Sequence, residues 1–315
     1  MPFAKTKPKK ELHEQTLEIS GAPKLGKTEL ASHFPKPVFM LTEPGQGGRE
    51  LVHWKPANWK SDEPYIIKSC TDFDNAYIEL CDATNQFQTV IIDTVDNMAN
   101  VIADDILKEN AVESLNEGAI AYGRGHSIFE KRFRTYLHQF AKLPMGLVMI
   151  SHQKEVSISR PGKEPLTAWR DTLNDRAKLI VQSMADMILM VRKEGKERFI
   201  YTEGDLSIEA GSRIALPERI PMGKSGTEAY QNLVTAFYGK NGNKKLAKDE
   251  LVTRILKAEA YLAENKIDSF DTDKRANNSR LKHLLFEDIE KASIENMESY
   301  LQHLKNKALA ARKEK

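Results

Sequence analysis

Eight residues near the start of the chain constrain its fold more than any other feature. They match the pattern G-x-x-x-x-G-K-[ST] and read Gly21-Ala22-Pro23-Lys24-Leu25-Gly26-Lys27-Thr28. An apolar segment, 16–20, comes directly before them and another follows, which is the strand, loop and helix order of a phosphate-binding loop. The glycines let consecutive backbone N–H groups turn toward phosphate oxygens. We therefore expect these eight residues to bind a nucleotide, with Lys27 reaching the β- and γ-phosphates and Thr28 ligating Mg²⁺. Pro23 removes one backbone donor, at a variable position of the pattern.

The composition is that of an ordinary globular protein. Of 315 residues, 40% are hydrophobic and 29% are charged, and the length suffices for a buried catalytic centre. Two cysteines, Cys70 and Cys81, are too few for a disulfide framework or a zinc cluster, so we expect free thiols in a reducing compartment. We find no apolar run of the roughly 18 residues that a membrane helix needs, and no secretory signal. We expect a cytoplasmic protein with no membrane partner.

The net charge of +2 conceals an uneven distribution. Residues 1–10 contain four lysines and no acid, and residues 305–315 contain five basic residues and one acid. The remainder has 38 basic and 44 acidic residues and is therefore mildly acidic. Affinity for nucleic acid would have to come from these basic ends or from local patches, although basic ends serve solubility equally well.

Strand-like and helix-like segments alternate along most of the chain, which is typical of a parallel α/β sheet. The expected strands are 16–20, 38–41, 90–93 and 146–151. The expected helices begin after Lys27 and near 72–83, 96–108, 127–141, 174–184 and 227–238. Segments 187–192 and 198–202 indicate a β-hairpin. The polar stretch 152–175 is expected to be a long connection, either functional or mobile.

The pattern divides the chain into three parts. Residues 1–14 are expected to form an exposed basic arm, 15–240 an α/β core, and 241–315 a small helical module with a basic tail. Asn241-Gly242-Asn243 indicates a linker. Ser293 is expected to be the N-cap of the last helix. Apolar residues recur at helical spacing in the module: Leu251, Ile255, Ala258 and Leu262; Leu281, Leu284, Leu285 and Ile289; Ile294, Met297, Leu301 and Leu304.

Two acidic residues follow expected strands. Asp93 ends the apolar run 90–93, which is the expected form of a buried strand that delivers a carboxylate opposite Thr28 to anchor Mg²⁺. The next residue is Thr94 rather than a water-activating acid, so the base must come from elsewhere. Glu43, at the end of another strand, is the candidate, with a solvated turn before Pro44 as the alternative.

These motifs resemble the RecA-type ATPase core, and more narrowly the phage-encoded RecA-core ATP-binding proteins, including the Sak-type single-strand annealing ATPases. The resemblance covers about residues 15–240 and rests on 19–29, 90–97, 122–125 and 147–153. It implies a RecA-like P-loop NTPase core with a mainly parallel sheet that hydrolyses ATP with Mg²⁺. It also implies homologous recombination or annealing on single-stranded DNA, a ring or filament of identical subunits, and a single-strand-binding protein as a further partner.

The resemblance also assigns roles to single residues. It makes Glu43 the catalytic glutamate and places a γ-phosphate sensor at His152 or Gln153, where the nucleotide state passes to a DNA-contacting loop. From the residues alone, both side chains stand at the end of an expected strand, which favours ligand contact, although a lone histidine is more often structural. The assignment between the two stays open.

Cationic side chains mark the candidate DNA contacts. The stretch after the expected sensor mixes cations with Trp169, a combination suited to phosphate contact and base stacking, and equally to a solvated lid. A second patch surrounds Tyr122. The candidate residues are Arg124, Arg132, Lys154, Arg160, Lys163 and Arg170. Arg213 occupies the place where related ATPases carry a cation that reaches a neighbouring subunit's nucleotide.

Two other functions remain open from the sequence alone. A small-molecule or nucleotide kinase would use the same P-loop and close 152–175 over a phosphoryl acceptor. A nucleotide-gated binding module would bind ATP with negligible hydrolysis. Dependence of turnover on DNA separates both alternatives from the DNA-coupled ATPase.

Overall fold

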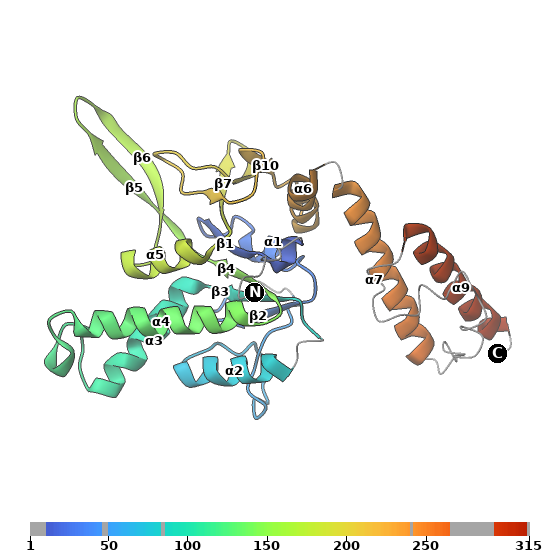
Figure 1. Cartoon of the computed structure of the whole chain (residues 1–315), viewed down its shortest axis with the longest axis horizontal. Coiled ribbons are helices and arrows are strands. Elements are labelled where there is room, and N and C mark those ends of the chain that lie inside the picture. Colours follow the sequence, from blue (N-terminus) through green and yellow to red (C-terminus); the bar gives the residue numbers. More distant parts are fainter. Residues whose placement is uncertain (1–10, 46–49, 83–85, 240–241, 265–292, 314–315) are drawn as a thin grey trace, which may run out of the picture. The chain divides into compact units, whose positions relative to one another are not determined.

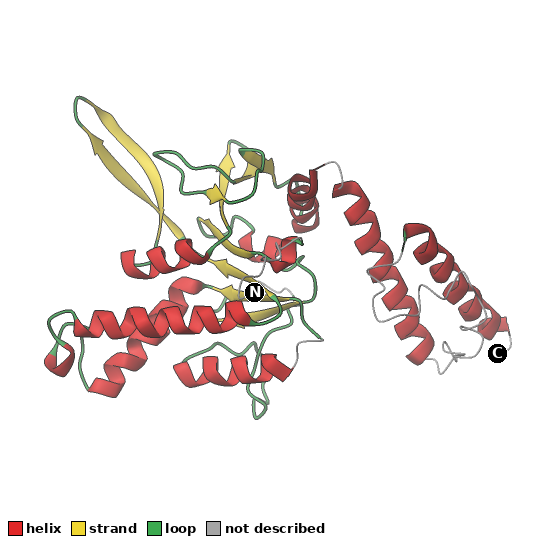
Figure 2. Cartoon of the chain, in the orientation of Figure 1, coloured by secondary structure: helices red, strands yellow, loops and turns green. Residues whose placement is uncertain are grey.

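The strands that carry the glycine-rich loop and Asp93 belong to one twisted, mainly parallel sheet (Figure 1, Figure 2). The structure, a computed structural model, describes residues 11–45, 50–82, 86–239, 242–264 and 293–313. Within these residues eight strands form the sheet in the order β10-β8-β7-β1-β4-β3-β2, with β9 paired to β7. They are β1 Thr16–Gly21, β2 Pro37–Leu41, β3 Thr89–Asp93, β4 Gly146–Ile150, β7 Met187–Glu194, β8 Glu197–Tyr201, β9 Gly211–Ser212 and β10 Arg219–Pro221. The strands from β7 to β2 run parallel, so their C-terminal ends meet at one edge.

Helices cover both faces of this sheet, which is why its central strands are continuous apolar runs. Alternate residues such as Met40, Ile92 and Met149 share one buried cluster with residues of α2 to α5. The intervening residues, such as Ile91, are buried on the opposite face, where α1 packs against β1 and β4. The helices are α1 Lys27–Ala31, α2 Cys70–Asp82, α3 Val95–Asn110, α4 Arg124–Lys142, α5 Asp175–Met184 and α6 Gly226–Tyr238, with 3-10 turns η1 Leu12–Glu14 and η2 Gly118–Ile120.

The expected fold class is confirmed. The four expected parallel strands correspond to β1, β2, β3 and β4, and the expected hairpin is the β7–β8 pair. The P-loop strand β1 lies at the centre of the sheet, between β7 and β4, with the Asp93 strand β3 one position beyond β4. This mixed α/β arrangement with a parallel centre fits the expected RecA-like P-loop core.

The prediction that 152–175 forms a long connection is wrong for residues 153–171. β5 Gln153–Arg160 and β6 Lys163–Asp171 form an antiparallel hairpin with its own two-stranded sheet, which projects from the body of the domain (Figure 1). Val156 and Ile158 alternate with serines and lie opposite Ala168 and Leu166. This period of two was present in the sequence, but the many charged residues obscured it.

Two further expectations are corrected at the boundaries of the core. Leu12, expected within an exposed arm, is 1% exposed and belongs to η1, while residues 1–10 lie outside the described residues. The expected linker at Asn241-Gly242-Asn243 is partly helical, because α7 begins at Gly242. The apolar residues Leu281, Leu284, Leu285 and Ile289, expected at helical spacing, lie outside the described residues.

The chain divides into two units, Met1–Phe237 and Tyr238–Lys315. In the second unit, α7 Gly242–Glu264 and α9 Ile294–Lys313 pack on one another. Ile255, Leu262 and Leu304 are buried in this small core, as the helical spacing predicts. Ser293 directly precedes α9 and its carbonyl accepts the Met297 N–H. None of the described helices combines the length and the apolar character that crossing a bilayer requires.

Candidate nucleotide-binding site

The P-loop, residues 21–28, joins β1 to α1 at the C-terminal edge of the sheet. Both of its glycines are required by the local geometry. A Cβ on Gly21 would lie 2.5 Å from the Val191 carbonyl oxygen, and Gly26 has φ +96°, in the left-handed region. Pro23, which lacks a backbone N–H, is exposed in the loop. The predicted loop is therefore built on the intended strand and leads into a short helix.

Lys27 is the buried cation of this loop. Its side chain is 5% exposed, and Nζ donates to the carbonyls of Gly21 at 2.7 Å and Ala22 at 3.0 Å. Burial lowers the pKa of the Lys27 ammonium to about 8, and the charges of Asp93 and neighbouring carboxylates oppose this shift. A lysine held against loop carbonyls is positioned for a phosphate group that approaches the loop.

The two residues expected to hold magnesium are in contact. Thr28 Oγ1 donates to Asp93 Oδ2 at 2.8 Å. Burial raises the pKa of Asp93, while the hydrogen bond from Thr28 lowers it. A hydroxyl and a carboxylate oxygen at the end of the P-loop are the hard ligands that Mg²⁺ takes, together with phosphate oxygens and water. Thr28 and Asp93 thus fit the ion, and when bound it would neutralise charge on the phosphates.

Glu43 and His152 form a pair beside Lys27. His152 Nε2 lies 2.8 Å from Glu43 Oε1, and His152 Nδ1 lies 3.4 Å from Lys27 Nζ. The other carboxylate oxygen of Glu43 accepts from Asn97 Nδ2 at 2.5 Å. β2, β3 and β4 therefore bring Glu43, Asp93 and His152 to the same end of the P-loop, as parallel strands with adjacent C-terminal ends should.

Gln153, the alternative sensor, faces a different set of residues. It is 4% exposed, and its Nε2 donates to Ser20 Oγ at 2.9 Å and to Asp171 Oδ1 at 3.3 Å. Of the two adjacent residues, His152 contacts Lys27 and Glu43, whereas Gln153 joins β1 to the base of the β5–β6 hairpin. Its role as a sensor of phosphate stays a prediction.

The residues around Gln153 form a buried acidic cluster that sequence reasoning missed. Glu18 is fully buried on β1, and burial together with the charge of Asp171 raises its pKa well above the usual value. Burial, followed by the charge of Glu209, raises the pKa of Asp171 to about 6. Ser151 Oγ donates to Glu18 Oε1 at 3.1 Å, while Glu18 Oε2 has no hydrogen-bond partner. Because Glu18 and Asp171 both favour their protonated forms, this cluster retains protons in the folded state.

Asp96 is a second missed residue. Its carboxylate accepts from the backbone N–H of His152 at 3.0 Å and from the hydroxyl of Thr172. Burial raises the pKa of Asp96, and the Thr172 hydrogen bond lowers it. One carboxylate therefore holds both ends of the β5–β6 hairpin. The sequence signal was present, since Asp96 and Asn97 follow the Asp93 strand within four residues and begin α3.

The candidate DNA-contacting cations differ in how they are held. Arg132 donates to both carboxylate oxygens of Glu109, at 2.8 and 2.7 Å. Arg160 donates to the Glu164 carbonyl, and Arg170 to the carbonyls of Trp169 and Leu206. Lys154, Lys163 and Arg124 are exposed. Lys154, Arg160, Lys163 and Arg170 all belong to the β5–β6 hairpin, whereas Arg124 and Arg132 lie on α4.

Arg213 binds within its own chain. Its guanidinium donates to Asp186 Oδ1 at 3.0 Å and to the Ser183 carbonyl at 3.0 Å, next to β9. The structure does not bring it to the P-loop of the same subunit. Its role across a subunit interface stays a prediction.

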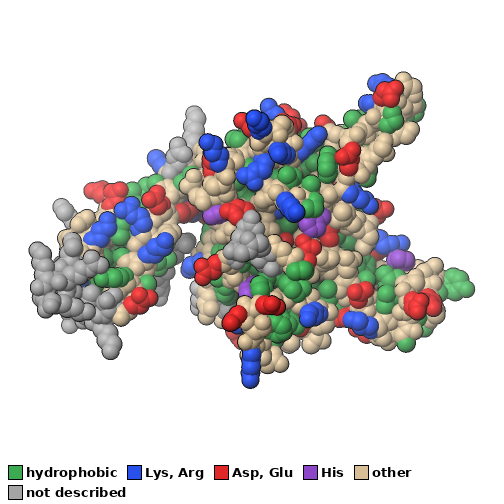
Figure 3. All heavy atoms as spheres, turned by 180° about the vertical axis from the view of Figure 1, so that it is seen from behind, with side chains coloured by type: hydrophobic (Ala, Val, Ile, Leu, Met, Phe, Trp, Pro, Cys, Tyr) green, Lys and Arg blue, Asp and Glu red, His purple; other side chains and the backbone are tan. Residues whose placement is uncertain are grey.

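Charge on the molecular surface is mixed. Figure 3 shows acidic and basic side chains over the same face, with Lys and Arg more closely grouped over β7, β8 and β10. The β7–β8 hairpin and β10 supply Arg192, Lys193, Lys196, Arg198 and Arg219. This grouping adds positive charge on the side of β1 opposite Asp93, which the linear sequence did not reveal.

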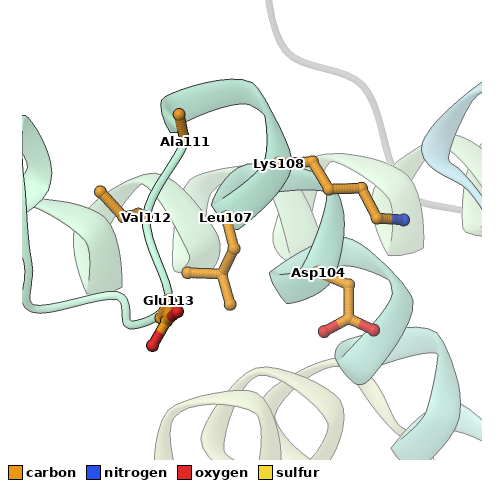
Figure 4. Close-up of a pocket in the computed structure, with 6 residues that line it drawn as sticks. All are labelled: Asp104, Leu107, Lys108, Ala111, Val112 and Glu113. Carbon is orange, nitrogen blue, oxygen red and sulfur yellow. The ribbon is translucent and has the colours of Figure 1, made fainter.

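A shallow depression of about 330 Å³ lies at the C-terminal end of α3, away from the P-loop (Figure 4). Its lining residues are Asp104, Leu107, Lys108, Ala111, Val112 and Glu113. Leu107 is eleven residues beyond Asp96, which corresponds to about 16 Å along the helix axis. The depression is therefore separate from the nucleotide site.

The loop, the buried lysine and the Thr28–Asp93 pair define a nucleotide-binding P-loop protein with an α/β fold. Residues 13–214 match the family model of an AAA domain, which is more than half of the chain. The protein belongs to this AAA domain family.

A prophage protein is also similar to this chain. The SPbeta prophage-derived uncharacterized protein YorG of Bacillus subtilis (strain 168) is 25% identical over 146 residues. The match covers 46% of this chain and 43% of that protein, so this chain spans less than half of the relative's length. Among solved structures, a KaiC-like protein, PH0186 from Pyrococcus horikoshii OT3, matches with a TM-score of 0.38 and 11% identity. That match covers 66% of this chain and 85% of the other.

Proposed function

We propose that this protein is a Mg²⁺-dependent ATPase that acts on single-stranded DNA in phage-type homologous recombination or strand annealing. One observation carries the ATPase part: Lys27, the Thr28–Asp93 pair and the Glu43–His152 pair converge at one end of the P-loop. In this proposal Lys27 and Mg²⁺ stabilise charge on the γ-phosphate, and Glu43 orients the attacking water.

The DNA part is supported by the β5–β6 hairpin. β4 ends at Ile150 and β5 begins at Gln153, so only Ser151 and His152 separate the sheet from the hairpin, and His152 itself contacts Lys27 and Glu43. The hairpin projects from the domain and carries exposed lysines, which suits contact with a phosphate backbone (Figure 1). Its 19 residues contain four cations and three acids, so we expect moderate, salt-sensitive affinity.

We expect a ring or filament of identical subunits and, as a further partner, a single-strand-binding protein. Light scattering with and without ATP measures the first. Arg213 is the candidate that would complete a neighbour's site, and a variant Arg213→Ala that keeps its assembly and its full turnover would remove that role.

The decisive measurement is steady-state ATP hydrolysis with and without a long unstructured single strand, at two salt concentrations. We expect DNA to stimulate turnover and salt to suppress the stimulation. Glu43→Gln should bind ATP and lose turnover by about a hundredfold or more, the usual scale for a general base. Wild-type turnover in Lys27→Ala would contradict the whole proposal.

A second candidate is a nucleotide-gated binding module with slow hydrolysis. It is favoured by the engagement of both Glu43 carboxylate oxygens, one by Asn97 and the other by His152. This candidate predicts tight ATP binding and equally slow turnover for wild type and Glu43→Gln, with or without DNA. Transfer of phosphate to a soluble acceptor would instead indicate the kinase.

A further inference from the structure

Arg198 contacts the P-loop from a strand that no sequence motif marked. It lies on β8, and its Nη1 donates to the Leu25 carbonyl at 3.1 Å. Its Nη2 donates to the Gly223 carbonyl at 3.4 Å, in the turn between β10 and α6. Within the described residues, Lys27 and Arg198 are the side chains that donate to carbonyls of residues 21–28. The guanidinium therefore bridges the P-loop and the β10–α6 turn.

The contact falls where the loop backbone is most constrained. A Cβ on Gly26 would lie 2.8 Å from Arg198 Nη1, so the guanidinium packs directly on this glycine. Gly26 is left-handed and immediately precedes Lys27, so its backbone sets the direction of the N–H groups after it. A planar, permanently charged fork with several donors holds two carbonyls at once in a way that a lysine cannot reproduce.

The strand order shows which part of a nucleotide this contact serves. Asp93 ends β3, while Glu43 and His152 follow β2 and β4. All three strands lie on one side of β1, and these residues mark the γ-phosphate end. β8 and β10 lie on the other side of β1. A nucleotide with its γ-phosphate beside Asp93 therefore extends its α-phosphate and nucleoside toward Arg198. That part is common to nucleoside di- and triphosphates.

We infer that Arg198 is a positioning residue for nucleotide binding: it clamps Leu25 and Gly26 against Gly223 and supports the nucleoside end of the site. The inference rests on nucleotide binding by the P-loop, but not on DNA or on hydrolysis. Arg198 acts through the loop backbone, so its loss weakens the bound state and the transition state of hydrolysis alike.

The test measures equilibrium affinity of the full chain for fluorescently labelled ADP and ATP, without DNA. Arg198→Met should raise both dissociation constants by the same factor, about tenfold, because a loop no longer held by Arg198 must be ordered when the phosphates bind. Arg198→Lys should recover part of the loss. KM for ATP should rise by a similar factor with kcat retained.

Arg219→Met is the matched control, since Arg219 lies on the adjacent strand β10 and donates to Glu194 instead. It should bind both nucleotides as the wild type does. Thermal unfolding of the nucleotide-free proteins shows whether Arg198→Met is folded, and the Arg198→Lys variant carries the test if it is not.

Wild-type affinity in Arg198→Met, or a loss confined to ATP, would overturn the inference. Unchanged binding in Lys27→Ala would instead overturn nucleotide binding by the P-loop itself. Absence of any DNA effect would leave the role of Arg198 unaffected.

Discussion

At the scale of single residues, burial governs the charge states in this site. Lys27 and the Glu18–Asp171 cluster have shifted pKa values for the same physical reason, desolvation, with opposite signs for a base and for acids. The buried lysine has a functional interpretation, because phosphate binding favours its charged form. The acidic cluster makes folding stability depend on pH, because Glu18 and Asp171 bind protons more tightly in the folded state than in the unfolded state.

The shift of Lys27 predicts how nucleotide affinity depends on pH. Burial lowers its pKa to about 8, so above this pH the free protein holds a neutral amine and must take up a proton to bind phosphate. The dissociation constant for ADP should be nearly constant from about pH 7 to 8 and then rise by up to tenfold per pH unit. Lys27→Arg should bind more weakly and lack this rise. Lys24→Asn, an exposed loop position, should retain it; a slope shared by all three proteins would contradict the assignment.

The shift of Asp171 predicts how stability depends on pH. Its folded-state pKa is raised to about 6, above the ordinary value near 4, so the folded state holds the proton more tightly than the unfolded state. The resulting stabilisation is complete below about pH 4 and is lost as the pH rises through 6. Relative to Asp171→Asn, the wild type should lose about 2–3 kcal/mol of unfolding free energy over this interval. Urea unfolding at several pH values measures this difference, and parallel profiles for the two proteins would refute it.

At the scale of elements, the sequence predicted the strands that carry the site and missed the hairpin that leaves it. The segments 16–20, 90–93 and 146–151 were recoverable because strands buried on both faces are apolar throughout. Val156 and Ile158 gave the correct period, but lysines, glutamates and Pro165 outweighed it in the linear pattern. Asp96 had a positional signal, because it follows the Asp93 strand. Arg198 had none, because its role depends on which strands become neighbours.

Shortening the hairpin separates its role from that of the nucleotide site. Ser157 and Thr167 are paired, so replacing 158–166 by Asn-Gly preserves the register and keeps Gln153 and Asp171 in place. We expect unchanged ATP affinity and basal turnover, with loss of the stimulation by single-stranded DNA. A filter-binding assay with labelled single strand gives the second readout. Undiminished stimulation would exclude Arg160 and Lys163 as the contact, with Lys154 and Arg170 at the base of the hairpin and Arg124 and Arg132 on α4 as the remaining candidates.

At the scale of the whole molecule, two units with separate apolar cores share the chain. The family match ends at residue 214, so it covers most of the first unit and none of the second. The helical spacing predicted the second core at Ile255, Leu262 and Leu304, whereas nothing in that spacing specifies what the unit binds. Nucleotide chemistry is therefore assigned to the first unit alone.

This division predicts that a fragment of residues 1–239 folds and binds nucleotide. It retains the sheet, the P-loop, Arg198 and α6, and loses only α7 and the residues beyond it. We expect cooperative thermal unfolding and an ADP affinity within about twofold of that of the full chain, since every residue of the described nucleotide site belongs to the first unit. Isothermal titration of both proteins makes the comparison. A fragment that unfolds without a cooperative transition would show that the second unit contributes to the core.

The hydrogen bonds that Asp96 accepts at both ends of the β5–β6 hairpin, from His152 and Thr172, bear on how the hairpin could move. The hairpin's eight-residue first strand is about 27 Å long at 3.4 Å per residue, and it begins directly after His152, which also contacts Lys27 and Glu43. A tilt of about 10° at the Asp96 contacts would displace the tip by about 5 Å, because displacement grows with distance along the strand. A change in the nucleotide site that tilted these contacts would therefore be magnified at the tip of the hairpin.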